Sequence, residues 1–473
     1  MEIEIFRKKI KGEVYERNSK EYESSLLDRW NLDALTINKP KLIVIVKNEN
    51  DIINSIKFCK ENNIEIAIKS GGHGFHSNCK GLLLDLNLLK GLKYNDYEKT
   101  VTIESGCRLG EMDKENQKHG YIIPSGIVSD TGVFGLTLGG GIGHLSRSYG
   151  LTCDNLLEAK LITCDGEIKI INKETDSQLL WALKGAGSNF GVVTELKFQL
   201  HKLNKIFVLK SLIGINENQS SSSSSSPPPP PPSPIFEKLK KLCEFIKENQ
   251  KINQFSVTII INSKELIVYS IYNGDYGNEY LNNMNCLVFN EPRKEIQPED
   301  YTILQQFCDK ELPRSKRYYK RGIFIKGELE FELLNKMIQS FNNHPIKDGL
   351  SYTISQLGGV FNNQIYNNNS SFSFRKSLYH ISFLTTLPID NEYQQNLFNN
   401  NNCIIEDKLK IKVYDWTNKT LDLFSNLKIG DYSNINDTFL STDNYYGENS
   451  KKLKELKLKY DPNNFFNNNP NIN

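Results

Sequence analysis

A glycine-rich segment in the first third of the chain sets the strictest limit on its structure. Residues 125–151 read SGIVSDTGVFGLTLGGGIGHLSRSYGL, and six glycines fall between positions 132 and 143. Each glycine costs a helix about 1 kcal/mol relative to alanine, so we expect a loop here and no regular helix. Apolar residues are interleaved with the glycines, unlike the sequence of a solvated flexible linker. We therefore predict a folded loop whose backbone comes close to a ligand.

A second glycine turn, KSGGHGFHSN at residues 69–78, lies between two apolar runs that are typical of buried strands, 64–68 and 81–86. A further strand at 42–46 and a helix at 51–62 precede it, which predicts a βαβ unit. Gly71 and Gly72 can adopt positive φ and expose backbone N–H groups to an anion such as a pyrophosphate. We expect His73 to project toward that ligand.

The rest of the chain alternates between helical and strand patterns. Before residue 203 we expect a strand at 101–104, a helix at 111–120, a hairpin at 156–163 and 167–171, a glycine turn within 181–193 and a strand at 194–200. Residues 220–234, a serine run followed by prolines, predict an exposed insertion. Beyond it we expect helices at 236–250 and 329–341, strands at 255–261, 266–272 and 379–385, loop tips at the asparagine runs 367–369 and 399–402, and a helix that stops at Asp461.

Length and charge exclude several classes of protein. A chain of 473 residues is too long for one ordinary core, so we expect two domains. A net charge of +2 gives no general field that would attract nucleic acid or an anionic membrane. The charged N-terminus and the lack of long apolar runs predict a cytoplasmic protein. Nine scattered cysteines without a C-x-x-C pair argue against a disulfide framework and fit reduced thiols.

Familiar nucleotide-binding templates fail in this sequence. Neither Gly141 and Gly143 nor the pair Gly185 and Gly187 extends to G-x-G-x-x-G, and no GK[ST] exists. Zinc is an alternative ligand for the second turn, because His73, His76 and Cys79 are spaced by three. That set lacks a nearby fourth ligand and an HExxH motif, so we predict no metal site.

Four motifs carry a family resemblance, in the same order along the chain. They are SGGHGF at 70–75, the glycine segment that begins at 125, WALKGAGSNFGVVT at 181–194 and YYGENSKKLKELKLKYDPNNFF at 445–466. Together they resemble the FAD-linked oxidoreductases of the berberine bridge enzyme-like family, which have a PCMH-type FAD-binding domain. The resemblance implies an α+β fold, in which a two-subdomain FAD-binding domain, residues 1–203, is completed by a C-terminal segment, 431–473. It also implies an inserted substrate domain at 204–430, an antiparallel sheet covered by helices.

The resemblance implies FAD as the cofactor, with His73 bonded covalently to the flavin 8α-methyl group. Many members have a second link through a cysteine, but this sequence has Val128 there, so we predict a single covalent bond. Lys69 stands in place of the usual arginine. The backbone of Ser70, Gly71, Gly72 and Gly74 would cradle the pyrophosphate. The other implied cofactor contacts are Gly132, Gly139, Gly140, Gly141, Gly143, Gly191, Val193 and Asn464.

Oxidation of an alcohol by a flavin also needs a base that takes the hydroxyl proton. Tyr432 resembles the active-site tyrosine of the family's Y-x-N-Y segment, although Ile435 replaces the second tyrosine. His380 is the alternative base, and Ser382 lies on the same side of its strand. A tyrosine with an ordinary pKa of about 10 needs a nearby cation to act at neutral pH, whereas a histidine needs little help.

These residues predict an enzyme that oxidises a small-molecule alcohol, a sugar or a secondary metabolite, with oxygen as acceptor and hydrogen peroxide as product. A flavin dehydrogenase with another acceptor is an alternative. So is a flavin-binding protein without turnover, which Phe75, Ile435 and the missing cysteine suggest, since plant members often carry a tyrosine in place of Phe75. The middle of the chain contains no motif that identifies the substrate, and nothing in the sequence predicts the oligomeric state.

Overall fold

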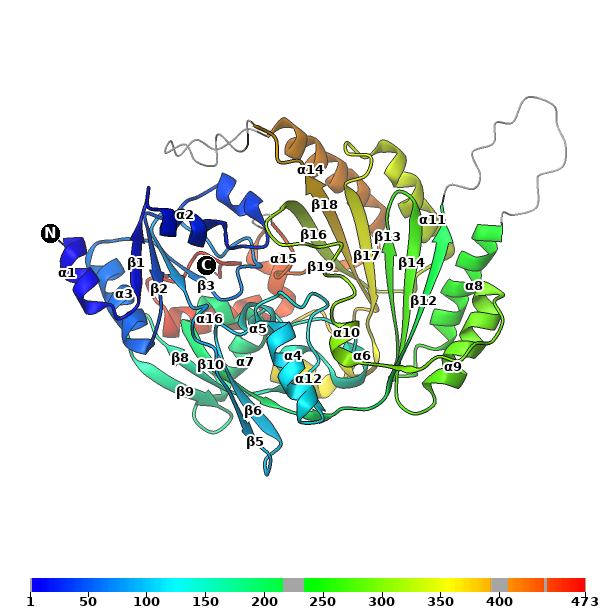
Figure 1. Ribbon diagram of the computed structural model, residues 1–473, viewed down its shortest axis with the longest axis horizontal. Helices are drawn as coiled ribbons and strands as arrows, with labels where there is room; N and C mark the ends of the chain where they lie inside the picture. The colour runs from blue at the N-terminus through cyan, green and yellow to red at the C-terminus, as the bar shows by residue number, and fades with distance from the viewer. Residues whose placement is uncertain (1, 216–233, 392, 394–406, 438–439, 473) are drawn as a thin grey trace.

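The computed structural model describes residues 2–215, 234–391, 393, 407–437 and 440–472 (Figure 1). The Ser/Pro insertion, except Pro234, and the asparagine run 399–402 lie outside these described residues. In the described part, the strands form sheets of four, five, two and eight strands, and helices cover them. This mixture of helices and mainly antiparallel sheets confirms the predicted α+β class.

The first sheet carries the predicted βαβ unit. Its order is β1-β2-β4-β3, with β1 (Glu13–Glu16), β2 (Leu42–Ile45), β3 (Ile66–Lys69) and β4 (Leu82–Asp85). Both β2 and β3 pair in parallel with β4, and α3 (Glu49–Glu61) connects them. The Asn48 side chain caps α3, whose buried Ile52, Ile56 and Cys59 follow helical spacing. The turn at 70–78 therefore leaves β3 at its carboxyl end and leads into β4.

The second sheet is antiparallel and confirms the predicted hairpin. Its order is β5-β6-β10-β8-β9, with β5 (Leu92–Asn95), β6 (Thr100–Glu104), β10 (Val192–Gln199), β8 (Leu156–Ile162) and β9 (Ile168–Asn172). The helices α4 (Leu109–Lys118), α7 (Ser177–Ala186) and α16 (Ser450–Tyr460) share its apolar core. Two short strands, β7 (Tyr121–Ile122) and β11 (His201–Lys202), form a separate antiparallel pair. The end of α16 directly before Asp461 confirms the predicted helix stop.

The third large element is an eight-stranded antiparallel sheet. Its order is β15-β12-β14-β13-β17-β18-β16-β19, with β12 (Ile206–Gly214), β13 (Phe255–Ile261), β14 (Glu265–Asn273), β15 (Pro298–Glu299), β16 (Arg317–Ile325), β17 (Leu350–Gln356), β18 (Tyr379–Leu387) and β19 (Lys428–Asp431). One face packs against α8 (Pro234–Glu248), α9 (Gly277–Met284), α11 (Phe331–Ser340) and α14 (Lys408–Leu421), which lie along the outer side of the sheet (Figure 1). Further helices are α1 (Glu2–Lys9), α2 (Lys20–Leu27), α6 (Ser146–Tyr149), α10 (Tyr301–Leu304) and α15 (Thr442–Tyr446).

Alternation along β17 separates its two faces. Tyr352 and Ile354 are buried in the core beneath the helices, whereas Ser351, Thr353 and Ser355 are only half-buried on the other face. This second face of the sheet carries short hydroxyl side chains and is directed toward the N-terminal part of the chain.

The glycine segment at 132–143 is partly helical, which corrects the expectation of a loop. Helix α5 (Val133–Leu138) follows Gly132 and ends at Gly139, and Val133 and Phe134 are buried in the core of the five-stranded sheet. Burial of these apolar side chains outweighs the low helix propensity of the single glycine inside this turn.

The asparagine run at 367–369 was predicted as a loop tip, and this was wrong. These residues form the end of α12 (Gln364–Asn369), which the Asn363 side chain caps by accepting from the backbone N–H of Ile365. The cap supplies a partner for an N–H group that the first turn of a helix leaves unpaired, and this favours a short helix.

The sheets suggest where the chain divides into domains. The strands of the eight-stranded sheet come from residues 206–431, and those of the other sheets from residues 13–202. We therefore propose domain boundaries near 203 and 430, with residues 431–473 returning to the first domain. Among the described residues, no helix has both the length and the apolar character that crossing a membrane requires.

Candidate active site

A large cavity lies where the glycine turn at 69–78, the segment 126–142 and the open face of the eight-stranded sheet meet. It encloses about 1750 Å³ of atom-free space, including its mouth. The wall also includes residues 432–436 and 468–470, from the end of the chain. Because the lining comes from segments that are far apart in the sequence, from Ile68 to Pro470, the cavity forms only in the folded protein.

The two glycine turns touch each other through their backbones. A Cβ atom added to Gly71 would lie 2.3 Å from the backbone nitrogen of Gly132, and one added to Gly132 would lie 2.5 Å from that of Gly71. Gly72 has φ +68, a conformation that favours glycine. These contacts explain why glycines occupy all three positions, and they leave the backbone itself as the surface of the cavity.

Ion pairs of the buried Lys69 stabilise the start of the glycine turn at 69–78. Lys69 is 1 % exposed, and its Nζ lies 2.8 Å from Asp85 Oδ2 and 3.3 Å from Asp28 Oδ2. The lysine that replaces the family's arginine is thus fully paired by carboxylates of β4 and of the segment after α2. This pairing fixes the start of the turn to its own sheet.

His73 lies in an aromatic stack at the edge of the cavity. Its ring is 4.3 Å from that of Trp30 with an interplanar angle of 17°, and Trp30 stacks in turn on Tyr318 at 4.0 Å. Burial, together with the positive charge of Lys320 and of two arginines, lowers the pKa of His73 well below its usual value. The imidazole is therefore neutral at physiological pH, and its buried Nε2 has no hydrogen-bond partner among the described residues.

The two candidate bases lie next to each other. The rings of His380 and Tyr432 are 5.2 Å apart at an angle of 80°, and both side chains line the cavity. The phenol oxygen of Tyr432 accepts hydrogen bonds from the backbone N–H of Gly141 and from Asn434 Nδ2, each at 3.0 Å. Burial raises the pKa of Tyr432 to about 12 and lowers the pKa of His380 to about 3. The Nε2 of His380 is buried and has no hydrogen-bond partner in the described part of the chain.

Most of the predicted cofactor residues line this cavity. They are Ser70, Gly71, Gly72, His73, Gly74, Gly132, Gly139, Gly191 and Val193. Gly140, Gly141 and Gly143 lie behind the wall, where added Cβ atoms would meet Phe372, Thr152 and the carbonyl of Ser125. Asn464 is in the turn after Asp461 and does not line the cavity, whereas Asn468, Asn469 and Pro470 do.

Sequence reasoning missed part of the wall. Thr353 and Ser355 lie on β17, and His76 of the turn at 70–78, which was named only in the zinc alternative, also lines the cavity. No strand was predicted at 350–356, although alternation of apolar and hydroxyl side chains there could have indicated one. Only the pairing of β17 with β18 shows that these side chains adjoin His380. In the described part of the chain, no three His, Cys, Asp or Glu side chains are grouped so as to hold a metal ion.

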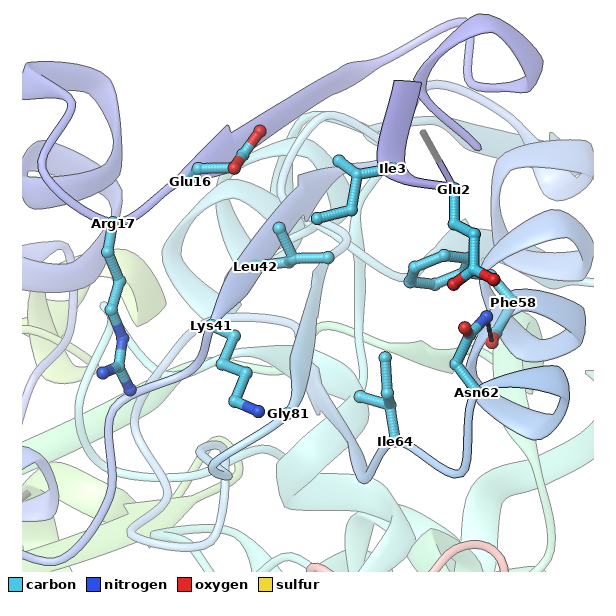
Figure 2. A pocket seen from close by; sticks show the side chains of 10 residues that line it. All are labelled: Glu2, Ile3, Glu16, Arg17, Lys41, Leu42, Phe58, Asn62, Ile64 and Gly81. Carbon is cyan, nitrogen blue, oxygen red and sulfur yellow. Dashed lines mark hydrogen bonds between the residues drawn. The ribbon is translucent and has the colours of Figure 1, made fainter. Parts of the chain in front are cut away.

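A second cavity, with about 770 Å³ of atom-free space, lies at the edge of the first sheet, between α1, β2 and α3 (Figure 2). Apolar side chains, such as Ile3 and Phe58, and charged ones, such as Arg17 and Lys41, line it. None of the predicted site residues is among its lining residues, so we assign the active site to the larger cavity.

Comparisons with known proteins identify the family. Residues 40–172 match the FAD binding domain family, and residues 431–473 match the family of berberine and berberine-like proteins. An FAD-linked oxidoreductase of Dictyostelium discoideum is 36% identical, over 99% of this chain and 96% of its own. The (R)-6-hydroxynicotine oxidase of Paenarthrobacter nicotinovorans is 34% identical, over 41% of this chain and 42% of its own.

Solved structures share the complete fold. Physcomitrella patens BBE-like 1 has a TM-score of 0.80 at 19% identity, covering 100% of this chain and 98% of its own. Xylooligosaccharide oxidase from Myceliophthora thermophila has a TM-score of 0.80 at 18% identity, covering 100% of this chain and 99% of its own. The chain belongs to the berberine bridge enzyme-like family of FAD-linked oxidoreductases, and it is an FAD-dependent enzyme.

The residues of the large cavity fit this cofactor. The glycine contact between residues 71 and 132 leaves backbone N–H groups in a concave wall, which suits a diphosphate. The neutral His73 and its unpaired buried nitrogen lie at the same turn. The cavity therefore offers donors for the anionic part of FAD and apolar walls for its rings.

Proposed function

We propose that the protein oxidises an uncharged small-molecule alcohol, such as a sugar or a hydroxylated secondary metabolite. When bound, FAD supplies the two-electron acceptor that takes a hydride from the carbon next to the hydroxyl group. The hydroxyl proton passes to a protein base, and oxygen finally receives two electrons and two protons to give hydrogen peroxide. The observation that carries the proposal is the pair of His380 and Tyr432 in the same cavity as the two glycine turns.

The polar groups of the cavity favour a neutral substrate. Among the described residues, its lining contains Ser, Thr, His, Asn and Tyr but no Asp, Glu, Lys or Arg. An ionic substrate would lose its hydration there without gaining a counter-charge. Thr353 lies opposite Ser382, and Ser355 lies opposite His380, so their hydroxyl groups form a patch beside the candidate base. Such groups both donate and accept hydrogen bonds, as recognition of several hydroxyl groups requires.

We assign proton transfer to His380 and substrate orientation to Tyr432. The lowered pKa of His380 keeps its ring unprotonated at neutral pH and leaves Nε2 without a hydrogen-bond partner among the described residues. A group with a pKa of about 3 is a weak base, so this assignment requires that the bound substrate and cofactor raise the pKa toward neutrality. The raised pKa of Tyr432 keeps its hydroxyl group protonated. Because Gly141 and Asn434 already donate to the phenol oxygen, the phenol proton remains available to the substrate oxygen.

We propose that His73 forms the single covalent bond to the flavin, since Val128 leaves no sulfur for a second one. Ser70, Gly71, Gly72 and Gly74 would hold the diphosphate. The proposed contacts with the rest of FAD are Gly132, Gly139, Gly191 and Val193, supported from behind by Gly140, Gly141 and Gly143 and by Asn464 in the C-terminal turn.

Anaerobic titration of purified protein with sugars and alcohols tests this function. A substrate should bleach the flavin absorption band near roughly 450 nm, and air should restore it with release of one hydrogen peroxide per turnover. His380→Gln should retain the yellow colour but bleach at least about a hundredfold more slowly, the contribution expected of a general base. Bleaching without recovery in air would instead indicate a dehydrogenase, and no bleaching by any substrate would indicate a binding protein.

We also propose a cytoplasmic location. All eight cysteines that the structure describes are free thiols, and seven of them are buried. Such a set suits a reducing compartment. Fractionation of cells that produce the protein, with detection in the medium and in the cytosol, tests this location, and recovery of the protein from the medium would contradict it.

A further inference from the structure

A segment of the proposed substrate domain forms hydrogen bonds with both glycine segments of the cavity. This segment, residues 305–316, runs from the end of α10 to the start of β16, and we call it the strap. Gln305 donates from Nε2 to the carbonyl of Gly126 at 2.7 Å. Asp309 accepts from the backbone N–H of Ser129 at 3.0 Å. The strap thus follows the loop that leads from residue 126 to Gly132.

Arg314 is the residue of the strap that reaches the glycine turn at 69–78. Its Nε lies 3.1 Å from Asp28 Oδ1, its Nη1 donates to Asp130 Oδ2, and its Nη2 donates to the carbonyl of Gly71 at 2.7 Å. The planar guanidinium therefore joins three separate parts of the chain at once, which a lysine cannot do with the same geometry. The side chain is 19% exposed, so solvent screens these contacts only weakly.

These contacts fix the direction of two peptide groups. Arg314 holds the carbonyl of Gly71, and the backbone N–H of Trp30 holds that of Gly72 at 2.9 Å. In a trans peptide the N–H of the next residue points opposite to the carbonyl. The N–H groups of Gly72 and His73 are thereby directed away from Arg314 and Trp30, at residues that line the cavity.

We propose that Arg314 is a positioning residue, which orients the peptide between Gly71 and Gly72 so that its N–H binds the diphosphate of FAD. The strap then couples the packing of the substrate domain to cofactor binding. Arg314 itself is not among the residues that line the cavity, and its guanidinium donates to Asp28, Asp130 and Gly71, so we do not assign it a contact with the cofactor. The inference rests on FAD binding alone and is independent of the substrate that the enzyme oxidises.

A purely structural ion pair would behave differently in binding experiments. If Arg314 only stabilised the fold, its loss would affect all ligands of the cavity alike, or none. If Arg314 orients the diphosphate-binding peptide, its loss should weaken the binding only of ligands that carry a diphosphate. FAD and ADP contain this group, and riboflavin lacks it.

The test uses full-length protein with His73→Ala, so that no bond to this imidazole forms and the ligands bind reversibly. FAD and riboflavin are titrated by flavin fluorescence, and ADP by calorimetry. Arg314→Gln should weaken FAD and ADP by about tenfold or more but change riboflavin by less than about twofold, since tenfold corresponds to about 1.4 kcal/mol. Arg314→Lys should have a thermal midpoint closer to that of the parent than Arg314→Gln has. It should nevertheless bind ADP at least about threefold more weakly than the parent does.

Lys310→Gln is the matched control, because Lys310 is an exposed residue of the same strap and its loss changes the net charge equally. It should leave all three affinities unchanged. Unchanged ADP affinity in Arg314→Gln, or in Arg314→Lys if the first variant does not fold, would overturn the proposal. So would an equal loss of riboflavin affinity. Neither result would bear on which alcohol the enzyme oxidises.

Discussion

At the scale of single residues, burial sets the chemistry of the histidines in this protein. His144 and His380 are buried, His73 is half-buried with a buried Nε2, and desolvation is the largest cause of the lowered pKa of each. A neutral imidazole is a nucleophile and a proton acceptor, whereas an imidazolium is neither. Burial therefore keeps both His73 and His380 unprotonated, which attachment to the cofactor and acceptance of a proton each require.

Replacement of His73 tests the covalent bond directly. The tryptic peptide that contains His73 should carry the added mass of FAD in the parent protein, and the colour should stay with the pellet after acid precipitation. His73→Ala should abolish both signals, because no other side chain is proposed as an anchor. His76→Ala, three residues further along the same turn, is the control and should retain the added mass. Covalent flavin in the His73→Ala variant would contradict the assignment.

Buried histidines also make stability depend on pH. Burial lowers the pKa of His144 to about 4, and neither ring nitrogen has a partner among the described residues. The unfolded chain then binds more protons than the folded one below about pH 6.5, so stability falls as the pH falls toward 4. This single group accounts for a loss of roughly 2 kcal/mol between pH 7 and pH 5.

His144→Phe removes the buried imidazole and should make the free energy of unfolding depend less on pH. Urea unfolding at pH 7 and pH 5 should show a smaller difference in the free energy of unfolding than in the parent protein. His119→Gln, at an exposed position, should leave the difference as it is in the parent. A variant with the parental pH dependence would show that His144 does not titrate on unfolding.

At the scale of elements, close backbone contacts position the site more than individual side chains do. Strand β16 is buried throughout, and Gly322 lies at its point of contact with the loop 432–436. The carbonyl of Gly322 accepts from the backbone N–H of Tyr432 at 2.9 Å, and its N–H donates to Asn436 Oδ1 at 2.6 Å. This strand therefore carries the proposed tyrosine through main-chain bonds.

Gly322→Ala tests this arrangement. The added Cβ would lie 2.9 Å from Ile435 and 3.0 Å from His380 Nε2, so one of them must shift. We expect kcat to fall by at least about tenfold, because displacement of a catalytic group by about 1 Å has large effects, while the FAD content stays unchanged. Gly214→Ala on β12 meets no atom within 4 Å and should change neither quantity. Normal kcat in the Gly322 variant would show that the loop tolerates this shift.

Comparison of the expected and observed elements shows where sequence patterns succeed. The strand at 255–261 and the helix near 51–62 carry uninterrupted periodic patterns, and both are present. The failures occur at 133–138 and 367–369, where local propensity disfavours the helices that form. Tertiary burial in the first case and a capping side chain in the second outweigh that propensity, and neither follows from residue composition.

At the scale of the whole molecule, buried ion pairs join the parts of the chain around the cavity. Asp33 is 0% exposed, and its carboxylate pairs with Arg317 of β16 at 2.9 Å and with Lys410 of α14. Arg317 also pairs with Asp407, and these charges raise its pKa. The network links the N-terminal segment to the eight-stranded sheet beside the aromatic stack that carries His73.

Asp33→Asn should uncouple these parts. Removal of the Asp33 carboxylate leaves the buried Arg317 with Asp407 as its remaining acidic partner and takes the carboxylate away from Lys410. Loss of one partner of a buried ion pair costs up to about 3–5 kcal/mol of the free energy of unfolding. Thermal unfolding should show a much lower midpoint, and a separate earlier transition for one domain would identify the network as the link. Asp275→Asn removes the partner of Lys205 in an exposed pair and should leave the midpoint nearly unchanged. A parental midpoint for Asp33→Asn would exclude this role.

The family resemblance carried by four motifs in order was sufficient to indicate the cofactor and the α+β class. Glycine turns and periodic strands could be predicted from the residues themselves, because short segments encode these local features. Residues Ser70 to Gly74 could be assigned to one turn for the same reason. Local features cannot show which distant segments meet. Long-range packing decides the contact between Gly71 and Gly132 and the approach of Arg314 to both turns. It also decides that Asn468 and Asn469 line the cavity, whereas the predicted Asn464 does not. The sheet register that sets His380 beside Ser355 is decided in the same way, since pairing between strands far apart in the chain follows from the burial of their shared face.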